Sequence, residues 1–159
     1  MAGRLLSELG ARVIKIEPPE GDRLRRQPPN ETGRSSPSFQ NLNSNKESVV
    51  VEAGSDVLQD VIAAADILLT DQTTLDDRGI ILTDGDLTAC NPGLVACHFT
   101  PFGRSGALAG RPGGELIAQA AGGIVATTGH PGETPHRAGP PLASHNAALL
   151  GGAAILPRE

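Results

Sequence analysis

Residues 111–146 read RPGGELIAQAAGGIVATTGHPGETPHRAGPPLASHN, and the expected fold is organised around this stretch. An apolar segment from Glu115 to about Ala126 has a helical pattern and lies between glycine-rich turns. A proline-rich loop then leads to a second helix of small residues, which begins near Ser144. Because glycine has no Cβ, such a stretch can form a wall that a ligand approaches closely. On spacing alone, the commoner arrangement is two packed small-residue helices with flexible connections.

The composition of the 159-residue chain favours a single α/β domain spanning residues 1–159. There is no Trp or Tyr and there are only 3 Phe, so Val, Ile, Leu and Ala must fill the core. Small aliphatic side chains suit parallel sheets that are covered by helices. We therefore expect a parallel sheet with helices on its faces.

The charge distribution argues against nucleic acid as a partner. The net charge is −5, and no basic run is present to neutralise a phosphate backbone. Residues 51–90 carry one Lys or Arg and nine Asp or Glu, spread over several expected elements. This pattern is typical of a solvated face rather than a metal cage. The spacing of His98, His130 and His136 fits no standard zinc motif, so we expect no metal site.

The two cysteines, Cys90 and Cys97, have neither CxxC spacing nor a signal peptide before them. Their pattern therefore favours a reduced, cytoplasmic chain. No apolar run is as long as a bilayer-spanning helix, so the expectation is a soluble protein that has no membrane partner.

The first half of the chain alternates helices and strands around one long polar segment. Leu5, Leu6 and Leu9 share a helical face in residues 1–10, and Gly10 stands where a helix would end. A β-branched strand in residues 11–19 follows, closed by two prolines. Residues 20–45 have almost no periodic apolar pattern, so a long loop is expected there.

The second half predicts strands at 48–53 and 66–71 and a turn followed by a strand in 91–99, with helices at 55–65 and 83–90 between them. Ser55 is the expected N-cap of the first helix, and Thr83 with Asp86 forms an expected capping pair for the second. This alternation predicts βαβ units with parallel strands and right-handed crossovers. The glycines of residues 103–110 form neither a phosphate loop nor the dinucleotide fingerprint.

The order of these segments resembles the N-terminal part of class III CoA transferases. This family includes carnitine and bile-acid CoA transferases and alpha-methylacyl-CoA racemases. The blocks that carry the resemblance are LLSELGARVIKIEPPEGD, NLNSNKESVVVE, AADILLTD, CNPGLVACHFTPFGRSGALAGRPGGELIAQAAGGIVATTG and GPPLASHNAALLGGAAIL. The most specific of them is GRSGALAGRPGGELIAQAAGG.

The resemblance implies a Rossmann-like parallel sheet with flanking helices. It also implies an incomplete fold, because the first strand and the C-terminal part of the family fold are missing here. Family members form interlocked dimers and bind CoA or acyl-CoA as a substrate rather than as a permanent cofactor. In the transferases an aspartate attacks the thioester, and a carboxylic acid finally accepts the CoA. In the racemases an acid–base pair moves a proton beside the carbonyl instead.

Carried over residue by residue, the resemblance places Ser144 at the position of the nucleophilic aspartate. The family pattern there is like LADxxxG, whereas this chain has Leu142, Ala143 and Ser144. A serine would need a general base, and its ester is a poorer acyl donor than an anhydride. Glu115 keeps a carboxylate at the start of the preceding helix, and it is the second candidate catalytic residue.

The resemblance also implies a set of CoA-contacting residues. Gly113 and Gly114 stand where many members have a glycine and then an aromatic or imidazole residue. Residues 70–74, which include Asp71, replace the ENFRPG segment beside the adenine end of CoA. Lys15 and Lys46 fit family blocks, although either is also explained as a surface charge beside a strand.

Two hypotheses follow for the function. In the first, the chain is a CoA-transferase-family protein that moves CoA between an acyl-CoA and a carboxylic acid, impaired by Ser144. In the second, it is a non-catalytic lobe or truncated remnant that acts through association with an active chain. Both imply a homodimer or a partner chain.

Overall fold

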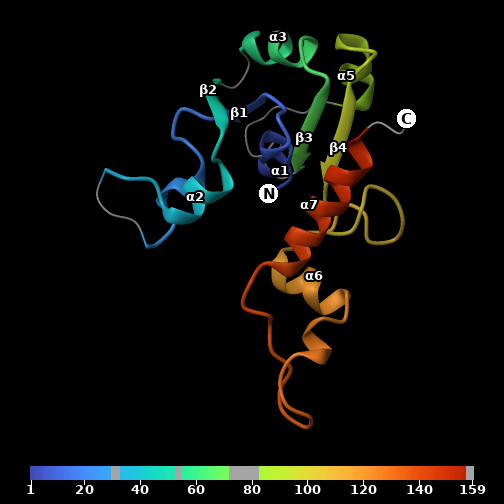
Figure 1. Cartoon of the computed structure of the whole chain (residues 1–159). Helices are drawn as coiled ribbons and strands as arrows, with labels where there is room; N and C mark the ends of the chain where they lie inside the picture. Colours follow the sequence, from blue (N-terminus) through green and yellow to red (C-terminus); the bar gives the residue numbers. More distant parts are fainter. Residues whose placement is uncertain (30–32, 53–54, 72–82, 157–159) are drawn as a thin grey trace.

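The computed structural model describes residues 1–29, 33–52, 55–71 and 83–156 (Figure 1). Helices and strands alternate along most of this length. In order they are α1 (Ala2–Glu8), β1 (Val13–Glu17), the 3₁₀ helix η1 (Arg23–Arg26), α2 (Pro37–Leu42), β2 (Lys46–Val50), α3 (Val57–Ala63), β3 (Ile67–Asp71), α5 (Asp84–Cys90), β4 (Val95–Phe99), α6 (Glu115–Ala121), the 3₁₀ helix η2 (Val125–Thr127) and α7 (Leu142–Ile155).

The strands form two parallel pairs. β1 pairs with β2, with Lys15 opposite Ser48, and β3 pairs with β4, with Leu69 opposite Cys97. The parallel α/β fold is thus confirmed. The βαβ unit predicted for residues 48–71 would place β2 and β3 in one sheet. In the described residues, however, β2 pairs with β1 and β3 pairs with β4. Apolar periodicity identifies strands but does not specify which strands pair, and that is why this detail was wrong.

The polar segment 20–45 is not the structureless loop that was expected. It contains η1 and α2, and local hydrogen bonds explain both. The Asp22 side chain accepts from the Leu24 N–H at 2.7 Å and so caps η1. Ser36 caps α2 through the Phe39 N–H at 3.1 Å, and the Phe39 side chain is buried. Single capping residues and one aromatic anchor leave no periodic signal in a sequence.

Helix capping follows the sequence in one case and departs from it in another. Thr83 and Asp86 form the predicted capping box at the start of α5. The N-cap of α3 is Asp56, not Ser55 as predicted. The Ser55 hydroxyl accepts instead from the N–H of Val57, the first residue of the helix, at 3.3 Å.

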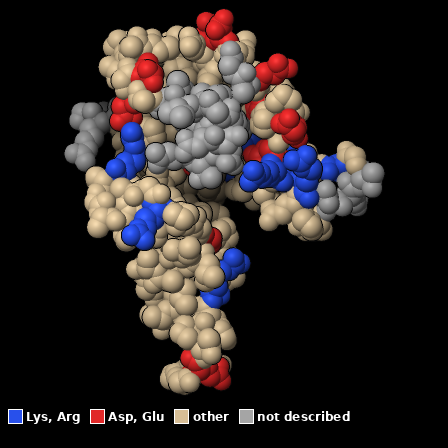
Figure 2. Space-filling model, turned by 180° about the vertical axis from the view of Figure 1, so that it is seen from behind, with Lys and Arg blue, Asp and Glu red and all other residues tan. Residues whose placement is uncertain are grey.

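The main apolar core lies between α3, α5 and the strands. Its buried members and the side chains packed on them are all aliphatic: Val51, Leu58, Ile62, Leu87, Ile16, Val49, Leu68 and Leu94. Acidic side chains gather at the end of the molecule that carries α3 and α5 (Figure 2). This matches the solvated acidic face predicted for residues 51–90.

α6 and the first part of α7 extend away from the strands, whereas the rest of α7 runs beside β4 (Figure 1). α6 ends at Ala121, earlier than predicted, and Gly123 then adopts a φ of 80° that favours glycine. α7 contacts α1, α6 and β4. A Cβ at Gly151 would lie 2.7 Å from the Phe99 ring, so this glycine lets α7 approach β4 closely.

Candidate functional site

Glu115 and Ser144, the two candidate catalytic residues, meet at the junction of α6 and α7. Glu115 is the first residue of α6, and Ser144 lies in the first turn of α7. α7 follows Pro141 and has no side-chain cap of its own. The Glu115 carboxylate supplies one from the other helix, accepting from the N–H groups of Ala143 at 2.8 Å and Ser144 at 3.0 Å. A carboxylate at a helix N-terminus is favoured electrostatically.

Two side chains complete the hydrogen bonding of this carboxylate. The Ser144 hydroxyl donates to Glu115 Oε2 at 2.5 Å, and Gln119 Nε2 donates to Oε1 at 2.7 Å. Each oxygen therefore accepts from one backbone N–H and one side chain. We call Glu115, Gln119 and Ser144, with the first turn of α7, the α6–α7 junction.

The junction holds Glu115 in its ionised form. Partial burial disfavours the charge, but the donors from Ser144, Gln119 and Ala143 outweigh it and lower the pKa to about 2. These donors are neutral, so the charge is stabilised by dipoles rather than by a cation. A carboxylate with so low a pKa is a weak base toward a serine hydroxyl.

The Ser144 hydroxyl does not donate to the adjacent His145. The Ser144 hydroxyl donates to Glu115, and within the described residues no hydrogen bond joins Ser144 to the imidazole. Successive residues on a helix point in different directions, which accounts for the separation.

Gly113 and Gly114 lie directly before Glu115 and differ in their surroundings. A Cβ at Gly113 would lie 2.6 Å from the Pro101 Cβ, so a side chain there would force the loop apart. A Cβ at Gly114 would meet nothing within 4 Å. Gly113 thus permits a close packing of the loop, whereas Gly114 leaves open space at the start of α6.

Lys15 and Lys46 come together on the neighbouring strands β1 and β2. Lys15 Nζ pairs with Asp22 at 2.5 Å, and Lys46 Nζ donates to Asn43 Oδ1 at 2.9 Å. Burial, and then the charge of Lys15, lower the pKa of Lys46. Asp71 ends β3, on the other strand pair. The structure therefore does not gather all candidate CoA contacts into one cluster, and residues 72–74 lie outside the described residues.

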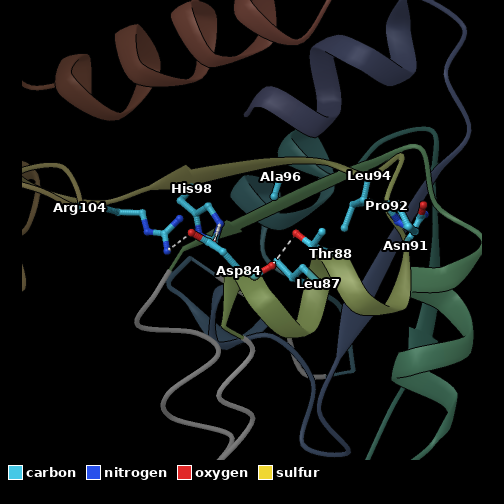
Figure 3. Close-up of a pocket in the computed structure, with 9 residues that line it drawn as sticks. All are labelled: Asp84, Leu87, Thr88, Asn91, Pro92, Leu94, Ala96, His98 and Arg104. Carbon is cyan, nitrogen blue, oxygen red and sulfur yellow. Dashed lines mark hydrogen bonds and ion pairs between the residues drawn. The ribbon is translucent and has the colours of Figure 1, made fainter.

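A second polar cluster lines a cavity of about 230 Å³ between α5 and β4 (Figure 3). Asp84 pairs with Arg104 at 2.9 Å, and His98 Nε2 lies 3.6 Å from Asp84. Within the part of the chain that the structure describes, His98 Nε2 is buried without a hydrogen-bond partner, and burial lowers the pKa of this imidazole. Leu87, Pro92, Leu94 and Ala96 form the apolar wall.

Sequence reasoning missed two parts of these sites. Gln119 lies four residues after Glu115, a spacing that places two side chains on the same helical face and so could have identified it. The cluster of Asp84, His98 and Arg104 draws on α5, β4 and the loop after β4. No local sequence pattern predicts that these three residues come together.

Two further observations concern metal ligands and membrane-spanning helices. Within the described ranges, no three His, Cys, Asp or Glu side chains are grouped as metal ligands would be. None of the helices described is both long and apolar enough to cross a membrane.

Comparison with known proteins identifies the family. The model of CoA-transferase family III matches residues 1–157. The cinnamoyl-CoA:phenyllactate CoA-transferase of Clostridium sporogenes is 36% identical over 162 residues, covering 94% of this chain and 38% of that protein. The BbsE subunit of the succinyl-CoA:(R)-benzylsuccinate CoA-transferase of Thauera aromatica is 35% identical over 143 residues, covering 85% of this chain and 35% of the subunit.

The fold agrees with this result. A CAIB/BAIF family protein from Brucella suis superposes with a TM-score of 0.87 at 34% identity, covering 97% of this chain and 43% of that one. The chain thus spans less than half the length of these relatives. The match over residues 1–157 and the shared fold show that the chain belongs to CoA-transferase family III.

Proposed function

We propose that this chain contributes the N-terminal part of a protein that moves CoA between an acyl-CoA and a carboxylic acid, and that Ser144 impairs the transfer. The observation that supports this proposal most directly is the α6–α7 junction, where the Ser144 hydroxyl donates to Glu115 at 2.5 Å. Family membership supports CoA transfer in general. The position of Ser144 in the family pattern supports its assignment to the nucleophile's place.

The chemistry of the junction explains the proposed impairment. An aspartate oxygen that attacks a thioester carbonyl expels the CoA thiolate and leaves an acyl anhydride, which the thiolate can attack in turn. A serine oxygen would leave an ester, which transfers its acyl group less readily, and it must first lose its proton. Glu115, with a pKa of about 2, is too weak a base to remove that proton efficiently.

Lys15, Lys46, Asp71, Gly113 and Gly114 are the residues we propose to contact CoA. The Lys15 and Lys46 side chains carry positive charges that could bind a phosphate group of CoA, and they lie on adjacent strands. Gly114 leaves open space beside Glu115 for the thioester end of the ligand.

We propose that the chain works with a second chain, either a copy of itself or a partner. One relative is itself named as a subunit of a CoA-transferase, which supports this arrangement. Association with an active chain is also the proposed role of this protein if it has no activity of its own. The free cysteines Cys90 and Cys97 support a reducing compartment, and we assign the protein to the cytoplasm.

The test combines ligand binding with acyl transfer. The melting temperature of the purified chain is measured against CoA and acetyl-CoA concentration, because a ligand that binds only the folded state raises it. Acyl transfer to a panel of carboxylic acids is then compared between the unmodified chain and Ser144→Asp. The matched control is Ser38→Asp, which adds the same charge to an exposed position in the first turn of α2.

The expected result is a CoA-dependent rise in melting temperature and transfer in Ser144→Asp alone. Loss of a nucleophile costs roughly 10⁶ in rate, so the unmodified chain should be inactive in the assay. Transfer by the unmodified chain that disappears in Ser144→Ala would contradict the proposed impairment. Absence of CoA binding at millimolar concentration would contradict the proposed CoA site.

A further inference from the structure

Gln119 is the most deeply buried polar side chain of the α6–α7 junction. It has 0% exposure, although it lies on a short helix whose neighbouring residues Leu116 and Ile117 are about half exposed. A buried amide is costly unless its donors and acceptor are satisfied. The environment of this residue is therefore built around hydrogen bonds rather than around apolar packing.

The Gln119 amide hydrogen-bonds to three residues, one on its own helix and two in the loop before α7. Its Nε2 donates to Glu115 Oε1 at 2.7 Å and to the Pro140 carbonyl at 3.3 Å. Its Oε1 accepts from the Ala138 N–H at 3.0 Å. Residues 138–140 lead directly into α7, which begins at Leu142. One side chain thus ties the carboxylate on α6 to the loop that delivers Ser144.

This geometry constrains the Glu115 carboxylate on both sides. Gln119 engages Oε1, while the Ser144 hydroxyl engages Oε2. The two N–H groups of α7 define the remaining directions, at 2.8 and 3.0 Å. Without the amide, Oε1 would keep only the Ala143 N–H, and the loop at 138–140 would lose two of its attachments to α6.

We propose that Gln119 is a positioning residue, which orients the Glu115 carboxylate toward position 144 and fixes the loop that carries this position. The role of position 144 in CoA transfer rests on the proposed function above, whereas the positioning itself does not depend on it. Gln119 acts through Glu115, so it is distinct from a catalytic residue. Its amide dipole also keeps Glu115 ionised, since a donor to a carboxylate stabilises the charged form.

The experiment is a site-resolved titration of Glu115 by carboxyl ¹³C NMR, in the unmodified chain and in Gln119→Met. Methionine has a similar length and can fill the buried site, but it has no amide to donate. Gln40→Met is the matched control, because the Gln40 amide donates to the Ser35 carbonyl at 2.7 Å on the distant α2 segment.

We expect the Glu115 midpoint to rise from about 2 in Gln119→Met and to stay unchanged in Gln40→Met. An unchanged Glu115 midpoint in a folded Gln119→Met chain would overturn the proposal, because it would mean that Gln119 only fills space. If Gln119→Met does not fold, the side-chain amide of Gln119 is followed in the unmodified chain. Its proton shift must then titrate together with Glu115, and a shift that does not follow Glu115 would equally overturn the proposal.

The titration separates this inference from the proposed function. It requires no CoA and no acyl transfer, so a chain that binds no CoA could still show the expected rise. Conversely, the chain could bind CoA while the Glu115 midpoint stays unchanged in Gln119→Met. That result would support the proposed CoA site and contradict the proposed role of Gln119. In Ser144→Asp chains that transfer CoA, we further expect Gln119→Met to lower kcat and to alter its pH profile, with little change in KM.

Discussion

Glu17 and Glu115 are two carboxylates whose pKa is lowered to about 2 by different kinds of donor. Arg25 holds Glu17 through two hydrogen bonds of 2.7 Å, aided by Ser48, and these outweigh the cost of burying a residue that is 1% exposed. Among the described residues no cation pairs with Glu115, which accepts from neutral donors on Gln119 and α7.

Glu17 is held in an ion pair, whereas Glu115 is held by neutral hydrogen-bond donors. Glu17 ends β1, and removal of the Arg25 cation would leave a buried charge without this partner. Glu115 spreads its charge over several neutral donors at a helix end. The first arrangement suits a structural role, whereas the second places a carboxylate against position 144.

Acidification should produce the largest effect, because it affects both carboxylates. Each pKa falls from an ordinary value of 4.5 to about 2 on folding, so the unfolded chain binds protons more readily. The stability that they contribute is fully present above about pH 4.5 and is lost as the pH falls toward 2. Urea unfolding at a series of pH values checks this, and a stability that is constant between pH 5 and 2.5 would contradict it.

Arg25→Met should be the most damaging single substitution. It leaves Glu17 buried without its cation and removes the guanidinium that lies 3.9 Å from the Phe39 ring centroid. We expect a loss of about 3 kcal/mol in the free energy of unfolding, the lower end for a broken buried pair because Arg25 is partly exposed. Arg12→Met is the control, since it breaks only the exposed pair with Glu47 and should change the free energy of unfolding far less. Equal losses in the two variants would refute the structural role of Glu17.

Glu115→Ala should have an intermediate effect. It removes the cap of α7 and one partner of the buried Gln119 amide, so we expect a loss of about 2 kcal/mol. Urea unfolding measures it, and Glu47→Ala serves as the exposed control. A loss no larger than that of the control would mean that Glu115 does not cap α7.

Salt should produce the smallest effect and distinguish the two carboxylates. The Glu17 midpoint should rise slightly between low and high ionic strength, because its stabilisation includes a charge pair that ions screen in part. The Glu115 midpoint should move less, since its donors are neutral. Parallel ¹³C titrations at the two salt concentrations test this order, and the opposite order would contradict the assignment of donors.

Much of the fold, but only part of the site, could be predicted from the sequence. The helix at α1, the capping box of α5 and the parallel strands follow from short-range patterns. The contact between Glu115 and Ser144 depends on the path of the long loop that brings the start of α7 back to the start of α6. The spacing of residues in the sequence does not specify such a path. The resemblance directed attention to both residues, but it did not predict that the serine would donate to the glutamate.

The most direct test of the central claim is a carboxyl ¹³C titration of the unmodified chain, with Glu17 and Glu115 assigned individually. We expect both midpoints to lie near pH 2, with the Ser144 amide proton shifting together with Glu115. A Glu115 midpoint near its ordinary value of 4.5, beside a Glu17 midpoint near 2, would contradict the account. It would mean that the α6–α7 junction does not hold the Glu115 carboxylate in its ionised form beside Ser144.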